Sequence, residues 1–333
     1  MTTLLEARYR TVLRLLPAYY RREREEEMVE IYLWDVDRDT QDESRPTLGE
    51  VASVAALALR TRLGAPGAPG RYALLGSTVR QFALYAVLLQ AAAAVVEGVL
   101  EVTWAATHGR AEWDLFRAGF DGPGPLGAAV GVAAWFLPLL WTAGYFALLH
   151  DRRRLARVAV LAAALPSLWP LVGPLVSDAF PPEPAYATAA ALFAWLPVLA
   201  LCAAHHRDAP PAALPAGTPG QVYMACCVVM GGSLVLTPTA ADAVWAPTTC
   251  FLVGALAWLL WRARRTGRGA VGGTLALAVL GLLVLVVRVA AIVPWLDVEI
   301  PAAFLVGSLT QATALLLLTA ALAVTAGRDL TTR

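Results

Sequence analysis

The chain has 333 residues, of which 58% are hydrophobic and 15% charged, and its formal net charge is +1. A soluble domain of this length is usually far less apolar, so the composition predicts an integral membrane protein. The near balance of charge disfavours nucleic acid as a direct partner, because phosphate binding normally needs a concentrated basic surface. The first long apolar run begins only at Phe82, so we expect no cleavable secretory signal.

The charged N-terminal segment predicts a small module of three helices over residues 1–63. Thr3 and Glu6 have the spacing of a capping box, as do Thr47 and Glu50, so each pair predicts the start of a helix. A proline between them ends the first helix and lets a second begin. Three short helices bury only a small core, so we expect the module to lean on the membrane domain or on a partner.

The run LRLLP, which starts at Leu13, and the run YRREREEEM, which starts at Tyr20, resemble the N-terminal module of a group of bacterial, largely actinobacterial, membrane proteins. That module is similar to the helical signalling domains called HAAS, which occur on membrane proteins encoded beside PadR-type transcription regulators. The resemblance covers about the first 63 residues and departs at Glu25, where the family usually has Gly. It implies a cytoplasmic protein partner, with candidate contacts at Tyr20, Arg21, Arg24, Glu26, Glu27 and Met28. A mixed charge run of this kind is, however, more often a solvated helix face laced with i to i+4 pairs.

The rest of the chain holds eight apolar stretches near the ~20 residues that a helix needs to cross a bilayer. They lie at 82–106, 125–149, 157–176, 185–204, 221–238, 244–261, 271–293 and 301–325. The fold class is therefore all-α, a polytopic membrane helix bundle with a small N-terminal cytoplasmic three-helix module. We expect the module at 1–63, a linker that leads into the membrane at 64–80, the eight-span domain at 81–326 and a cytoplasmic tail at 327–333.

The arginines predict the orientation of this bundle. All 26 basic residues are Arg, and 23 of them lie where an eight-span topology with both termini inside puts cytoplasm. The exceptions are Arg110, Arg117 and Arg288. We therefore predict a multi-pass protein of the cell membrane with both termini cytoplasmic. Span five is short and could be re-entrant, which would reverse every later span.

Apart from Arg157 at the edge of span three, three charged residues fall inside spans, where an unpaired charge costs several kcal/mol. Glu97 and Glu101 lie four apart in span one, and Arg288 lies in span seven at a similar depth when about 1.5 Å is counted per residue. We predict that Arg288 pairs with one of the two acids, either as a structural ion pair or as part of a substrate or proton site. Gln90 and Gln311 lie nearer mid-membrane and could extend a polar path. Prolines at 138, 166, 170, 174, 197 and 294 interrupt or end several spans.

Two classes of function remain. HExxH, GxSxG and Walker motifs are missing from the sequence, and no GxGxxG follows a predicted strand, so we predict no enzyme, no cofactor and no metal site. The favoured hypothesis is a regulatory or signalling membrane protein whose N-terminal module binds a cytoplasmic partner, such as a PadR-type regulator. The alternative is a permease or channel subunit that moves a small solute or ion through a site near Glu97, Glu101 and Arg288. The sequence leaves the ligand and the oligomeric state open.

Overall fold

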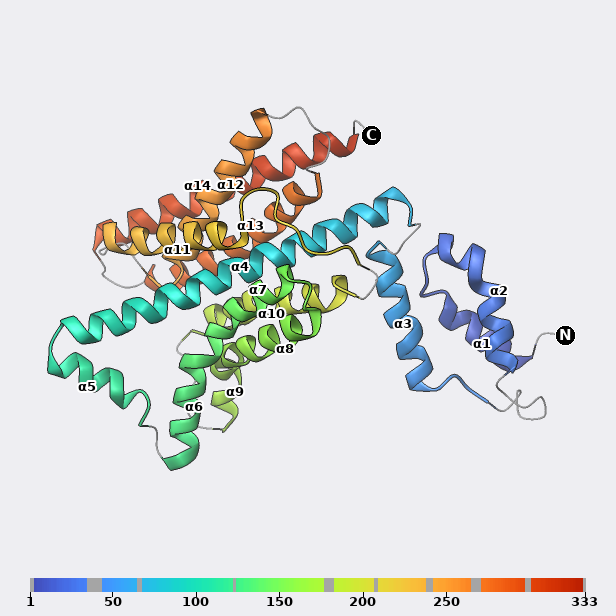
Figure 1. Cartoon of the computed structure of the whole chain (residues 1–333), viewed down its shortest axis with the longest axis horizontal. Coiled ribbons are helices and arrows are strands. Elements are labelled where there is room, and N and C mark those ends of the chain that lie inside the picture. Colours follow the sequence, from blue (N-terminus) through green and yellow to red (C-terminus); the bar gives the residue numbers. More distant parts are fainter. Residues whose placement is uncertain are drawn as a thin grey trace. The chain divides into compact units, whose positions relative to one another are not determined.

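A computed structural model describes residues 3–34, 44–64, 68–121, 124–176, 183–206, 209–237, 242–264, 271–296 and 301–331. Every regular element in these ranges is helical, as predicted for an all-α protein (Figure 1). The chain divides into two compact units, Met1–Val79 with Ala203–Pro210, and Arg80–Cys202 with Pro211–Arg333.

The first unit contains the three predicted N-terminal helices, α1 (Leu4–Leu13), α2 (Ala18–Trp34) and α3 (Leu48–Arg62). Both predicted helix starts are confirmed by side-chain caps. The Thr3 hydroxyl accepts from the Glu6 backbone N–H at 3.3 Å, and Thr47 exchanges two such bonds with Glu50 in a full capping box.

A small apolar core holds these three helices together. Leu13 is fully buried between them, and the Tyr9 ring stacks on Tyr32 with the ring centroids 3.9 Å apart. Because so few side chains are buried, most of the stability of this unit rests on a handful of contacts.

Within the described residues, eight helical segments are long and apolar enough to cross a membrane. They agree with the eight predicted spans, and span five forms a helix of 18 residues. In chain order the segments are α4 (Gly70–Thr107); α6 (Gly124–Phe136), η2 (Leu137–Leu139) and α7 (Leu140–Leu149); α8 (Arg153–Ala164), η3 (Leu165–Leu168) and α9 (Trp169–Val176); α10 (Pro184–Ala204); α11 (Pro219–Leu236); α12 (Trp245–Arg264); α13 (Val271–Ile292) with η5 (Val293–Trp295); and α14 (Ala302–Thr331).

Two details near span one differ from the prediction. Helix α4 begins at Gly70, well before the predicted span start at 82, and its 38 residues measure about 57 Å at about 1.5 Å per residue. The prediction followed the start of the apolar run, which marks where a helix enters an apolar environment. The first residues of α4 are more polar, so they were not included. The loop after span one also contains a short helix, α5 (Arg110–Ala118), whose Phe116 ring packs edge-on against Trp135.

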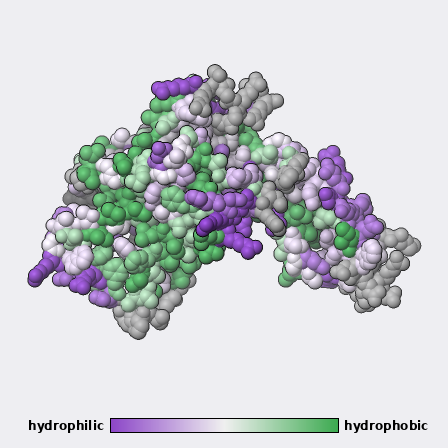
Figure 2. Space-filling view, viewed as in Figure 1, coloured by the Kyte–Doolittle hydropathy of each residue, from purple (hydrophilic) through white to green (hydrophobic). Residues whose placement is uncertain are grey.

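The exterior of the spans is apolar, as a lipid-facing surface must be. Figure 2 shows hydrophobic side chains, in green, over broad areas of the second unit. Leu282, Leu317 and Val228 are each more than half exposed there. On a water-soluble monomer such continuous apolar surface would drive aggregation, whereas in a bilayer it is the favourable contact with lipid. A polytopic membrane protein accounts for it.

Candidate functional site

Arg288 lies on α13 and is completely buried, but its partner is not the one predicted. Its Nη1 atom donates to both carboxylate oxygens of Asp242 at 2.6 Å, and its guanidinium lies 5.6 Å from the ring centroid of Trp245. The predicted pairing with Glu97 or Glu101 is therefore wrong. Counting residues along a span gives the depth of a side chain but not the direction in which it points, and Arg288 points toward the start of α12.

Glu97 and Glu101 are one turn apart on α4, yet they lie in different surroundings. Glu97 lines a cavity of about 280 Å³, together with Gln90. Glu101 does not line it, and its Oε2 atom accepts a hydrogen bond from Trp135 Nε1 at 3.2 Å. The three charged residues that the sequence grouped into one site thus separate into an ion pair, a cavity carboxylate and a carboxylate bonded to an indole.

The wall of this cavity is mostly apolar and aromatic. Trp141, Tyr186 and Phe193 are the aromatic residues of its lining. Alanines from α4, α8 and α10, with Ala243 just before α12, form much of the rest. Gln90 is held in place because its Nε2 atom donates to the Phe193 carbonyl at 3.2 Å. One carboxylate therefore faces a chamber that has few other polar groups.

Two helix interruptions border the same cavity. Pro138 and Pro166 both line it and lie in η2 and η3, the short 3₁₀ turns that divide spans two and three. Proline removes a backbone donor, and irregular backbone at membrane depth is tolerated where it lines a cavity or is buried in protein. The other predicted prolines lie in α9 (Pro170 and Pro174), in α10 (Pro197) and in η5 (Pro294).

A second hollow, of about 370 Å³, adjoins the first. The two share Tyr186, Ala243 and Val244, and the second also has the carboxylates of Glu183 and Asp242 in its lining. Sequence reasoning missed Tyr186 and Asp242. The signal that could have found them is their position, because each lies within three residues of the start of a span that borders the cavity.

Gln311, the remaining predicted polar residue, is buried on α14 outside both hollows. Its Nε2 atom donates to the Trp245 carbonyl at 3.1 Å and to Thr249 Oγ1 at 2.9 Å. It joins α14 to α12. The predicted extension of a polar path through Gln311 therefore has no support in these contacts, whereas Gln90 does lie beside Glu97.

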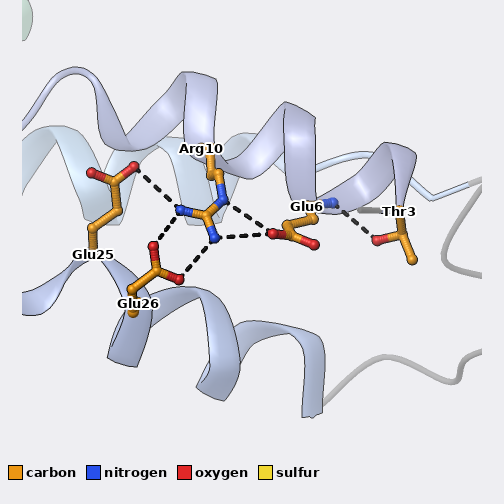
Figure 3. Close-up of polar contacts among 5 residues, drawn as sticks. All are labelled: Thr3, Glu6, Arg10, Glu25 and Glu26. Carbon is orange, nitrogen blue, oxygen red and sulfur yellow. Dashed lines mark hydrogen bonds and ion pairs between the residues drawn. The ribbon is translucent and has the colours of Figure 1, made fainter. Parts of the chain in front are cut away.

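The charged residues predicted as partner contacts on α2 are largely engaged within the module. Arg10 bonds Glu26 at 2.8 Å and Glu6 at 3.0 Å, with Glu25 at 3.7 Å (Figure 3). The bond to Glu26, followed by that to Glu6, raises the pKa of Arg10, and the same Arg10 bond lowers the pKa of Glu26. The mixed charge run thus contains ion pairs that join α1 to α2.

The other predicted contacts are divided between the core and the surface of the module. Tyr20 and Met28 pack partly buried against its apolar core, and Arg21 is half-buried. Arg24 is exposed and bonds Glu27 at 3.4 Å.

An apolar surface lies at the end of α2. Ile31 is 63% and Trp34 87% exposed, and both border a shallow hollow of about 450 Å³. Tyr9, Met28 and Tyr32 complete its lining. We call these five residues the α2 face. Ile31 and Trp34 thus leave an apolar surface of the module exposed.

Comparison of the chain with protein-family models, with curated proteins and with solved structures finds no match.

Proposed function

We propose that this polytopic membrane protein has a regulatory role, in which its N-terminal module binds a cytoplasmic protein through the α2 face. The observation that carries the proposal is the exposure of Ile31 and Trp34 beside a hollow. Aromatic anchors of this kind supply much of the binding energy at protein interfaces. The resemblance of the module to HAAS domains supports a PadR-type regulator as the partner, and the distribution of arginines supports a cytoplasmic location.

The test is a binding measurement between the full-length protein in nanodiscs and the purified product of an adjacent regulator gene. We expect Trp34→Ala to weaken binding by about 30-fold, as loss of an anchor of about 2 kcal/mol would. The matched control is Leu48→Ala, because Leu48 is 89% exposed on α3 but does not line the hollow. Failure of the wild-type protein to bind, or equal weakening by both variants, would contradict the proposal.

A second candidate function is movement of a small solute or ion through the spans. It is favoured by one observation, the cavity that holds Glu97 and meets a second hollow at Tyr186. Liposome flux should then fall in Glu97→Gln and stay near wild type in Glu101→Gln. Flux that is indifferent to Glu97→Gln would remove this candidate.

A further inference from the structure

We infer that the cavity at Glu97 is a binding site for a small organic cation, an amine or quaternary ammonium with apolar substituents. The inference rests on the second candidate function, because it uses the same cavity. It does not require transport, because a sensor could bind the same ligand. Glu97, Trp141, Tyr186 and Phe193 carry it, since each lines the cavity.

The first step is the charge of the chamber. Among the described residues that line the cavity, Glu97 is the one charged side chain. The arginine nearest to it in depth, Arg288, is already bonded to Asp242. Arg110 and Arg117, on α5, are not in the cavity lining either. Glu97 is exposed rather than enclosed, so its carboxylate is open to a cation that enters the cavity. Because the surroundings are mostly apolar, such a cation would stabilise the carboxylate.

The second step is the nature of that cation. A divalent metal ion needs several oxygen ligands, and the described residues contain no group of three His, Cys, Asp or Glu side chains that could hold one. Aromatic faces, in contrast, attract ammonium groups and are the usual surroundings of quaternary ammonium ligands. The rings of Trp141, Tyr186 and Phe193 together with one carboxylate therefore fit an organic cation better than a metal ion.

The third step is size. The cavity of about 280 Å³ lies just below the range of ~300–1,000 Å³ that is usual for ligand pockets. It suits a compact ligand with one ring or a few short alkyl groups. Its alanine-rich wall would contact the apolar part of such a molecule.

The fourth step is the approach. The adjoining hollow shares Tyr186 with the cavity and has Glu183 and Asp242 in its lining. Arg288 compensates Asp242, so Glu183 supplies the remaining negative charge there. A hollow lined by acidic groups concentrates cations and disfavours anions, which matches the ligand class assigned to the inner cavity.

The experiment measures by calorimetry the affinity of benzyltrimethylammonium for the full-length protein in nanodiscs of neutral lipid. Neopentylbenzene, which has the same shape without the charge, is the comparison ligand. We expect the cation to bind the wild-type protein about tenfold or more tightly than the neutral isostere does. Glu97→Gln should remove this preference. Glu101→Gln should retain it, because Glu101 lies one turn further on α4 and does not line the cavity.

A second variant keeps the inference testable if Glu97→Gln cannot be recovered folded. Ala94→Leu leaves every charge in place and fills part of the cavity, since Ala94 is in its lining. We expect it to weaken binding of the cation by about tenfold or more while the protein remains monodisperse. The inference is overturned if the wild-type protein does not bind millimolar cation, if the isostere binds equally well, or if neither variant changes binding. If the cation binds but no flux is measured, the transport function is excluded and this site stands. If flux is measured but the cation does not bind, this site is excluded.

Discussion

Two arginines, one in each unit, form their ion pairs in different environments. Arg10 bonds Glu6 and Glu26 at the surface of the N-terminal module, whereas Arg288 is fully buried and has Asp242 as its one acidic partner among the described residues. In water a surface ion pair adds little to the free energy of unfolding, because solvent already stabilises both charges. In an apolar interior, loss of one partner leaves a charge that nothing else compensates. We therefore expect loss of one partner to destabilise the protein more at the Arg288 pair than at the Arg10 cluster.

The largest effect should come from breaking the buried pair. We expect Asp242→Asn to destabilise the second unit by about 3–5 kcal/mol, because Arg288 then stays buried and charged. Thermal unfolding in nanodiscs measures this. The double variant Arg288→Met with Asp242→Asn should recover much of the loss, since no buried charge remains. An exposed arginine on α5, changed in Arg117→Gln, serves as the control. A double variant as unstable as the single one would contradict the comparison.

A smaller effect is expected in the apolar core of the module. Leu13 is fully buried against α2 and α3, so Leu13→Ala should lower the free energy of unfolding of the module by about 2–5 kcal/mol. Leu15 lies two residues away and is 42% exposed, so Leu15→Ala should cost no more than about 0.5 kcal/mol. Hydrogen exchange of residues 3–62 in the full-length protein measures both. Equal protection in the two variants would mean that this core does not govern the stability of the module.

The smallest effect is the pH dependence of the Arg10 cluster. Arg10 lowers the pKa of Glu26 in the folded module, so the unfolded chain binds a proton to Glu26 at a higher pH than the folded chain does. The pair therefore contributes stability above the unfolded pKa of about 4.3, and this contribution is lost as the pH falls through the lower folded value. Hydrogen exchange between about pH 5 and pH 2 should show this loss in the wild-type protein.

Arg10→Gln should flatten that part of the pH profile, whereas Arg24→Gln should not, because Arg24 bonds a different acid, Glu27, at 3.4 Å. High salt should reduce the effect in the wild-type protein, since the pair is exposed. Identical profiles for the wild type and Arg10→Gln would show that the cluster contributes nothing to the stability of the module.

Most of the fold could be predicted because each signal for it is local. A capping pair such as Thr47 and Glu50 fixes a helix start over four residues, and twenty apolar residues fix a span. The extension of α4 back to Gly70 and the short helix α5 were missed, since neither has a strong hydropathy signal.

The site was harder to predict because it depends on which way each span is rotated about its axis. Glu97 and Glu101 are one turn apart in the sequence, yet only the first lines the cavity. Asp242 lies just before the predicted span at 244–261, and nothing near it in the sequence indicates that it bonds an arginine 46 residues later. The prolines at 138 and 166 were visible, but the cavity that they share required the packing of spans two and three.

The interruptions at Pro138 and Pro166 also have a mechanical consequence. A helix bends most easily where its backbone bonds are already missing, and sharp bends occur mainly at proline. Spans two and three each have such an interruption at the wall of one cavity. We therefore expect bending of either span at these points to change the shape of the chamber beside Glu97.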